Sequence, residues 1–141
     1  MSQVTQFELM PGVNLTAVHT KKFKSSLLGV QLLAPLDRER ASCNALVPMV
    51  LRRGSEAHPD MESLSAALDE LYGGSLEPVI RKRGETQCVG FLGSFLDDAY
   101  APAGEGVLER AAALMGEVLL RPATREGGFR SEDVEGERHN L

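Results

Sequence analysis

The feature that most constrains the fold is an almost continuous apolar run at residues 26–34, Ser-Leu-Leu-Gly-Val-Gln-Leu-Leu-Ala. A run of this length without a charged side chain is typical of a β-strand that is buried on both faces. Pro35 ends the run, because proline has no N–H to donate to a sheet ladder. We therefore expect this strand to be buried, together with the apolar faces of the helices predicted further along the chain.

Strand and helix patterns surround this run. Before it, residues 5–9 and 14–20 predict two short strands joined by a turn at Pro11-Gly12. After it, apolar residues recur at helical or strand spacing. The predicted elements are helices over 37–53, 61–72 and 104–120, a hairpin over 75–82 and 85–95, a loop over 123–130, and a fourth helix from Ser131.

Local signals mark the ends of several elements. Asp37 and Asp60 can cap the first two helices, and Gly54 can end the first. Pro48 lies inside the first helix, where it removes a backbone donor at a cost of about 3 kcal/mol. Pro78 favours an edge position for the first arm of the hairpin. The order of elements predicts an α+β fold in two layers, with helices packed on one face of an antiparallel sheet.

Composition excludes several classes of function. With 141 residues, 43% hydrophobic and 25% charged, the chain can form one domain with its own core. A net charge of -5 and an aromatic content of 5% argue against nucleic-acid binding. No run approaches the roughly 20 apolar residues that span a bilayer, and the N-terminus lacks a signal-peptide pattern. Cys43 and Cys88 fall in apolar runs, so we expect two buried free thiols and a cytoplasmic location.

Four stretches share their order and spacing with a known family. They are Lys22-Phe-Lys-Ser25, Leu46–Ser55, Leu64–Leu76 with its Leu-Tyr-Gly-Gly sequence, and Phe129–Arg138. Together they resemble the first half of a domain of the pitrilysin/insulinase-type (M16) zinc peptidases. The resemblance implies a LuxS/metallohydrolase-like M16 domain, present in part over residues 1–141 and cut within its last helix.

In active members of that family, the first helix carries His-x-x-Glu-His, which supplies two zinc ligands and the carboxylate that activates water. Aligned on this motif, Asn44 stands at the first His, Val47 at the Glu and Pro48 at the second His. None of these side chains can take over the role, and the third ligand position would fall beyond Leu141. The resemblance therefore implies no catalytic residue and no cofactor here, with zinc expected only in an active partner.

The resemblance also implies a peptide-binding strand. In active relatives an extended peptide adds to the edge of the strand after the Gly-Gly pair. The resemblance therefore implies that four residues bind peptide, Leu76, Glu77, Val79 and Ile80. Pro78 removes a donor from that edge, so peptide docking would be altered.

Partners follow from the same resemblance. The degenerate motif is similar to that of bacterial M16-like proteins, which implies pairing with an active M16-like subunit or a second M16 domain. A partial domain would expose apolar surface, so self-association is also expected. We expect neither a nucleic-acid nor a membrane partner.

Two other functions stay open. The chain could belong to an active M16 peptidase whose catalytic site lies in another domain or chain, or it could be an unrelated α+β binding module. Patterns for other chemistry are weak. His19, His58 and His139 are scattered, Cys43 has no neighbouring base, and the sequence lacks nucleophile-elbow and phosphate-binding glycine motifs.

Overall fold

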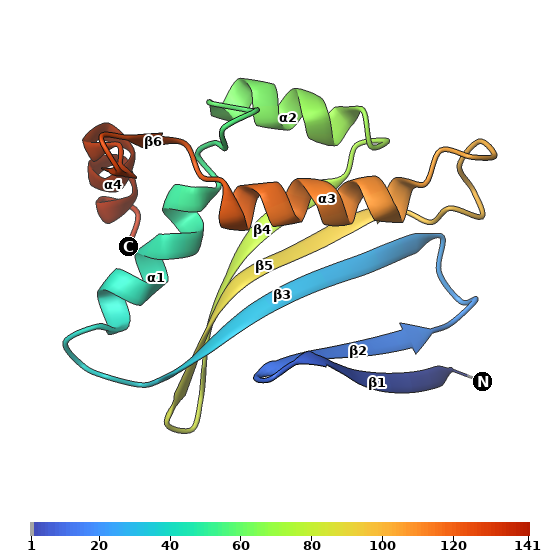
Figure 1. Cartoon of the computed structure of the whole chain (residues 1–141), viewed down its shortest axis with the longest axis horizontal. Coiled ribbons are helices and arrows are strands. Elements are labelled where there is room, and N and C mark those ends of the chain that lie inside the picture. Colours follow the sequence, from blue (N-terminus) through green and yellow to red (C-terminus); the bar gives the residue numbers. More distant parts are fainter. Residues whose placement is uncertain (1) are drawn as a thin grey trace.

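A three-stranded antiparallel sheet with helices on one side forms the body of the molecule (Figure 1). The computed structural model describes residues 2–141. The strand order is β3-β5-β4, with β3 at Ser25–Pro35, β5 at Thr86–Leu96 and β4 at Ser75–Arg83. The predicted α+β class is confirmed, and so is the edge position of the strand that contains Pro78.

The remaining elements flank this sheet. Helices α1, α2 and α3 lie on the same side of it, and α4 lies next to α1 (Figure 1). Strands β1 and β2 form a separate hairpin beside β3. The bounds are β1 Gln3–Met10, β2 Val13–His19, α1 Ala41–Leu51, α2 Met61–Asp69, α3 Val107–Leu120, β6 Thr124–Arg125, β7 Gly128–Phe129 and α4 Ser131–Arg138.

The core lies between the sheet and α3. Side chains alternate across a strand, so β5 directs Phe91 and Phe95 toward the helices, where both are buried. Val107 and Val118 of α3 are fully buried against them. Each such side chain contributes about 1.5–3 kcal/mol through burial, so this contact holds the helical layer on the sheet. Within residues 2–141, none of the helices is long and apolar enough to cross a membrane.

The prediction that residues 26–34 are buried on both faces is wrong. Leu28 and Val30 of β3 pack against the core, but Leu27 and Leu33, on the opposite face, are 68% and 69% exposed. The helices cover only one face of the sheet, and β3 is an edge strand rather than a central one. An apolar run alone does not distinguish these two environments.

Two predictions about the first helix are also wrong. It begins at Ala41 rather than Asp37, and its N-cap residue is Arg40. Asp37 instead forms a turn, in which its side chain accepts a hydrogen bond from the Glu39 N–H at 2.8 Å. Cys43, predicted to be buried, is exposed, whereas Cys88 is buried as predicted. Ser42 and Cys43 both lie on the exposed side of α1, although the helix is apolar along most of its length.

Other boundaries agree more closely with the sequence. Asp60 caps α2 as predicted, and Ser63 completes a reciprocal capping box with it. The hairpin β4–β5 and the hairpin β1–β2 lie where the strand patterns placed them. The predicted loop over 123–130 contains the short hairpin β6–β7, which the sequence analysis did not anticipate.

Candidate functional site

Helix α1 places the three aligned motif positions over β5 and the core. Asn44 is half-buried, and its side-chain Nδ2 donates a hydrogen bond to Gln87 Oε1 at 3.1 Å. Gln87 of β5 is only 5% exposed, and its Nε2 donates to the Ala41 carbonyl at 2.8 Å. The first motif position therefore takes part in an amide bridge that ties α1 to the sheet.

The other two motif positions are apolar and packed. Val47 contacts the hydrophobic core, and Pro48 is fully buried. The helix continues through the proline, since the Arg52 N–H donates to the Pro48 carbonyl at 3.1 Å. The expected disturbance of the helix is therefore local: Pro48 lacks one donor but does not end α1. No three His, Cys, Asp or Glu residues in the described range 2–141 lie close enough together to hold a metal ion.

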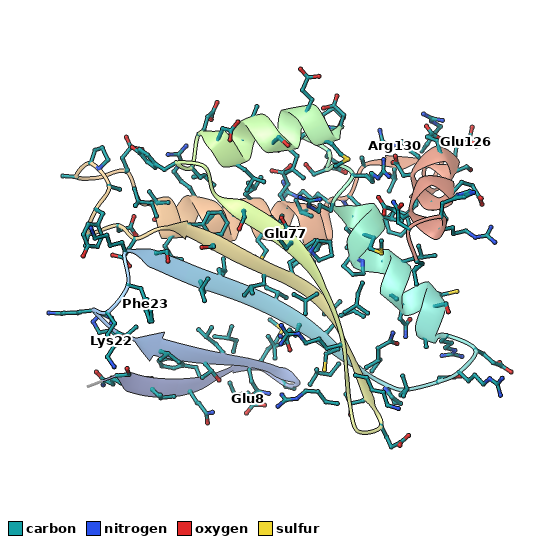
Figure 2. The ribbon with its side chains drawn as sticks, turned by 180° about the vertical axis from the view of Figure 1, so that it is seen from behind. Glu8, Lys22, Phe23, Glu77, Glu126 and Arg130 are labelled. Atoms are coloured by element: carbon teal, nitrogen blue, oxygen red, sulfur yellow. The ribbon has the colours of Figure 1, made fainter. Side chains whose placement is uncertain are left out.

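The end of α1 contacts the free edge of β4. Arg52 Nε donates to the Leu76 carbonyl at 2.9 Å, and its Nη2 lies 3.3 Å from Glu77 Oε1. Figure 2 labels Glu77 on this strand. Because the Leu76 carbonyl points toward Arg52 rather than toward β5, alternation along the strand places the backbone groups of even-numbered residues on the free edge. Arg52 thus occupies one acceptor of that edge.

The four candidate peptide-binding residues divide into two kinds. Leu76 and Ile80 direct backbone groups to the free edge, whereas Glu77 and Val79 direct theirs to β5. Leu76 is 1% exposed and Ile80 is 42% exposed. Pro78 lies between them and has no N–H. Because residue 78 faces the free edge, the missing donor leaves the ladder to β5 intact. The available edge therefore begins at the Pro78 carbonyl and extends toward the hairpin tip.

Basic residues follow at that tip. Arg81, Lys82 and Arg83 line a 430 Å³ hollow with Gln31 and Cys88. None of these three cations has an ion-pair partner among the described residues. They form a local positive region on a chain whose net charge is -5.

Helix α4 is fixed to the end of α1 by a partly buried ion pair. Arg53 Nε lies 2.5 Å from Glu137 Oε1, with side chains 28% and 12% exposed. Gly136 permits this approach, because a Cβ at that position would lie 3.1 Å from the guanidinium of Arg53. Glu137, which lies in the stretch Phe129–Arg138 that resembles the family, therefore has a structural partner.

The connector after α1 is fixed to α3 by Glu117. Its carboxylate accepts a hydrogen bond from the fully buried Ser55 hydroxyl, and its Oε1 lies 3.1 Å from His58 Nδ1. Burial raises the pKa of Glu117, but hydrogen bonds from Ser55 and His58 outweigh it and hold that pKa below its usual value. The hydroxyl bonds to the carboxylate and not to the imidazole, so this cluster is not arranged as a nucleophile with its base.

Sequence reasoning did not predict the contacts that organise this region. Gln87, Arg52, Arg53 and Glu117 all act on partners distant in the chain, and Asn44 and Gln87 are 43 positions apart. The available signal was Gln87 at the start of the apolar run Cys88–Gly93, because a buried amide requires hydrogen-bond partners.

Comparison with known proteins gave three findings. No family model matches the chain. The chain is 35% identical over 143 residues to the protein named "Probable inactive metalloprotease YmfF" of Bacillus subtilis (strain 168), a match that covers 100% of this chain and 33% of that protein. It also matches the crystal structure of a conserved protein from Enterococcus faecalis V583, with a TM-score of 0.91, 27% identity and coverage of 97% of this chain and 32% of that one.

These matches concern the whole chain but only part of each relative. The chain spans about a third of the length of the two proteins. The Enterococcus faecalis structure has the same fold over nearly all of these residues. By sequence, the chain is similar along its full length to a metalloprotease-like protein.

Proposed function

We propose that this chain is a non-catalytic, M16-like peptidase homologue that holds an extended peptide at the free edge of β4. The observation that carries the first part is the Asn44–Gln87 bridge, which engages the side chain at the aligned ligand position in structural hydrogen bonds. Val47 and Pro48 offer no polar side-chain atom to a metal ion or a water molecule. The name of the Bacillus subtilis relative, a probable inactive metalloprotease, supports the same proposal.

The peptide-holding role is supported by the geometry of the β4 edge. From Pro78 to Lys82, the outward backbone groups are the carbonyls of residues 78, 80 and 82 and the N–H groups of residues 80 and 82. A peptide that adds here as a strand would be bonded mainly through Ile80 and Lys82. The basic tip would favour an acidic residue at the adjacent end of the peptide.

The resemblance also supports a partner. We propose that the protein works beside an active M16-like subunit or a second M16 domain, in which the zinc would reside. The alternative is that the chain is part of an active zinc metalloendopeptidase whose catalytic site lies in another domain or chain. That alternative draws support from the match to only a third of each relative. A protease assay of the whole protein, with and without a zinc chelator, separates the two, because chelator-sensitive cleavage by the purified protein alone requires the alternative.

A binding experiment at one residue tests the peptide-holding role. The probe is a short fluorescein-labelled peptide of alternating Val and Thr that ends in Asp, followed by fluorescence anisotropy. Ile80→Pro removes an outward N–H without removing a bond to β5, whereas Ile80→Ala keeps the N–H and removes only the side chain. We expect Ile80→Pro to weaken binding on the order of tenfold relative to Ile80→Ala. Equal affinity of the two variants, or no saturable binding to the unaltered chain, would overturn the peptide-holding role.

A further inference from the structure

Odd-numbered residues of β4 carry their side chains on the open face of the sheet, which is the face away from the helices. Leu76 belongs to the core between the sheet and the helices, and side chains alternate along a strand. The side chains of β4 on the open face are therefore, from the end near α1 to the hairpin tip, Glu77, Val79, Arg81 and Arg83. This row changes along the strand from acidic to apolar to basic.

The acidic and basic ends of this row differ in their partners. Glu77 is engaged by Arg52, whose Nη2 lies 3.3 Å from Glu77 Oε1. Arg81 and Arg83 are exposed, and neither has a carboxylate within ion-pair distance among residues 2–141. A guanidinium without such a partner can form a charge-assisted pair with a carboxylate of a ligand. The row therefore favours an acidic ligand group at the tip and not at Glu77.

The hollow at the tip extends this basic end across the sheet. It has a volume of 430 Å³ and is lined by Gln31 of β3, Cys88 of β5 and the three cations Arg81, Lys82 and Arg83. Arg81 is directly opposite Cys88 in the ladder, so both side chains lie on the open face. A ligand side chain that enters the hollow from the β4 edge would meet cations and an amide that can donate hydrogen bonds, and both suit a carboxylate.

The backbone alternation of β4 determines which residue of an added peptide faces Arg81. Ile80 and Lys82 direct backbone groups outward, so each forms a hydrogen-bonded pair with a residue of an antiparallel peptide. The peptide residue between these two opposes Arg81 in a non-hydrogen-bonded pair, in which the Cα atoms are about 4.5 Å apart. Arg83 is its diagonal neighbour at about 7–8 Å, within reach of a long side chain. Both guanidiniums can therefore reach a carboxylate at this one peptide position.

We infer that the β4 edge selects peptides that place acidic residues opposite Arg81 and Arg83 and an apolar residue opposite Val79. Read from the amino end of an antiparallel peptide, the pattern is acidic-x-acidic-x-apolar, because β4 runs from Val79 toward the tip. Arg81 is the specificity-determining residue, since it lies directly opposite the central acidic position. This inference rests on the proposed peptide-holding role, to which it adds the chemical class of the peptide and the side chains that recognise it.

Two matched peptides test this selectivity. Glu-Thr-Glu-Thr-Val and Gln-Thr-Gln-Thr-Val, each with fluorescein at the amino end and an amide at the carboxyl end, have nearly the same shape and differ in the two negative charges. Fluorescence anisotropy measures their affinities. We expect the unaltered chain to bind the Glu peptide more tightly than the Gln peptide, on the order of fivefold. Arg81→Gln should reduce this preference to about twofold, because only Arg83 then faces the acidic positions.

Lys22→Gln is the matched control, because it makes the same change in net charge at another exposed residue. Lys22 lies in the connector before β3, away from the tip of the β4–β5 hairpin (Figure 2). This variant should keep the full preference for the Glu peptide. The double variant Arg81→Glu/Arg83→Glu should instead prefer Lys-Thr-Lys-Thr-Val over the Glu peptide, because the charges on the two sides are exchanged. Circular dichroism checks that all variants fold.

Two results would overturn this inference and leave the peptide-holding role intact. One is saturable binding of the Glu and Gln peptides to the unaltered chain with equal affinity, which would mean that the edge accepts a strand without recognising its charge. The other is an equal loss of preference in Lys22→Gln and Arg81→Gln, which would assign the effect to net charge alone. Absence of saturable binding by all of the peptides would overturn the peptide-holding role, and the inference with it.

Discussion

The amide bridge between α1 and β5 makes a quantitative prediction about stability. Asn44→Ala removes one neutral hydrogen bond and leaves the oxygen of the buried Gln87 without that donor, which should lower the free energy of unfolding by about 1–2 kcal/mol. Gln87→Ala removes two hydrogen bonds and part of a buried side chain, so its cost should be about 3 kcal/mol. The double variant should cost about 1 kcal/mol less than the sum.

Urea unfolding followed by circular dichroism measures these differences. A loss of 1 kcal/mol should lower the midpoint by about 0.5 M urea if the slope is about 2 kcal/mol/M. Asn14→Ala is the matched control, because Asn14 lies exposed on β2 and should change stability by less than about 0.5 kcal/mol. Strictly additive effects of the two substitutions, or an Asn44→Ala variant as stable as the unaltered chain, would refute the structural role that we assign to Asn44.

Three further predictions concern other parts of the fold. Gly90→Ala should destabilise the fold by several kcal/mol, because a Cβ there would lie 2.0 Å from the Val30 carbonyl oxygen. Gly116→Ala meets no atom within 4 Å and should stabilise α3 by about 0.5–1 kcal/mol. Thermal melts of both variants check this, and a Gly90→Ala variant with an unchanged melting temperature would contradict it. Arg53→Met breaks the partly buried pair with Glu137 and should speed amide hydrogen exchange across α4. Arg125→Met breaks an exposed pair and should not. Equal exchange rates in the two variants would count against the role of the Arg53–Glu137 pair in holding α4. Folding lowers the pKa of Glu117, so the carboxylate should stabilise the fold fully above its usual pKa of 4.5 and lose that effect as pH falls through the lower folded pKa. The difference in unfolding free energy between the unaltered chain and Glu117→Gln should therefore shrink in urea melts at acid pH. A difference that stays constant with pH would exclude this stabilising role.

Local signals predicted the elements that depend on neighbouring residues. Asp60 capped α2 because the cap and its Ser63 partner lie within one turn. Pro78 predicted an edge strand because the missing donor acts at its own position. The order of these elements was enough to predict an α+β fold with helices on one face of an antiparallel sheet.

Features that depend on distant contacts could not be read in the same way. The apolar run of β3 predicted burial on both faces, but the number of covered faces depends on where α3 and α1 pack. Asp37 had the chemistry of a cap. Its side chain instead accepts a hydrogen bond within the turn over residues 37–40, and α1 begins only at Ala41. In the candidate site, the sequence identified Asn44 as unable to serve as a zinc ligand, but its partner Gln87 became apparent only from the structure.

The most direct test of the central claim is the zinc content of the chain itself. The protein is equilibrated with excess zinc, freed of unbound metal by gel filtration, and measured by inductively coupled plasma mass spectrometry. The account predicts no stoichiometric zinc, because Asn44, Val47 and Pro48 carry a structural amide bridge and two apolar side chains in place of a ligand set. One zinc ion per chain, lost on Asn44→Ala, would contradict it.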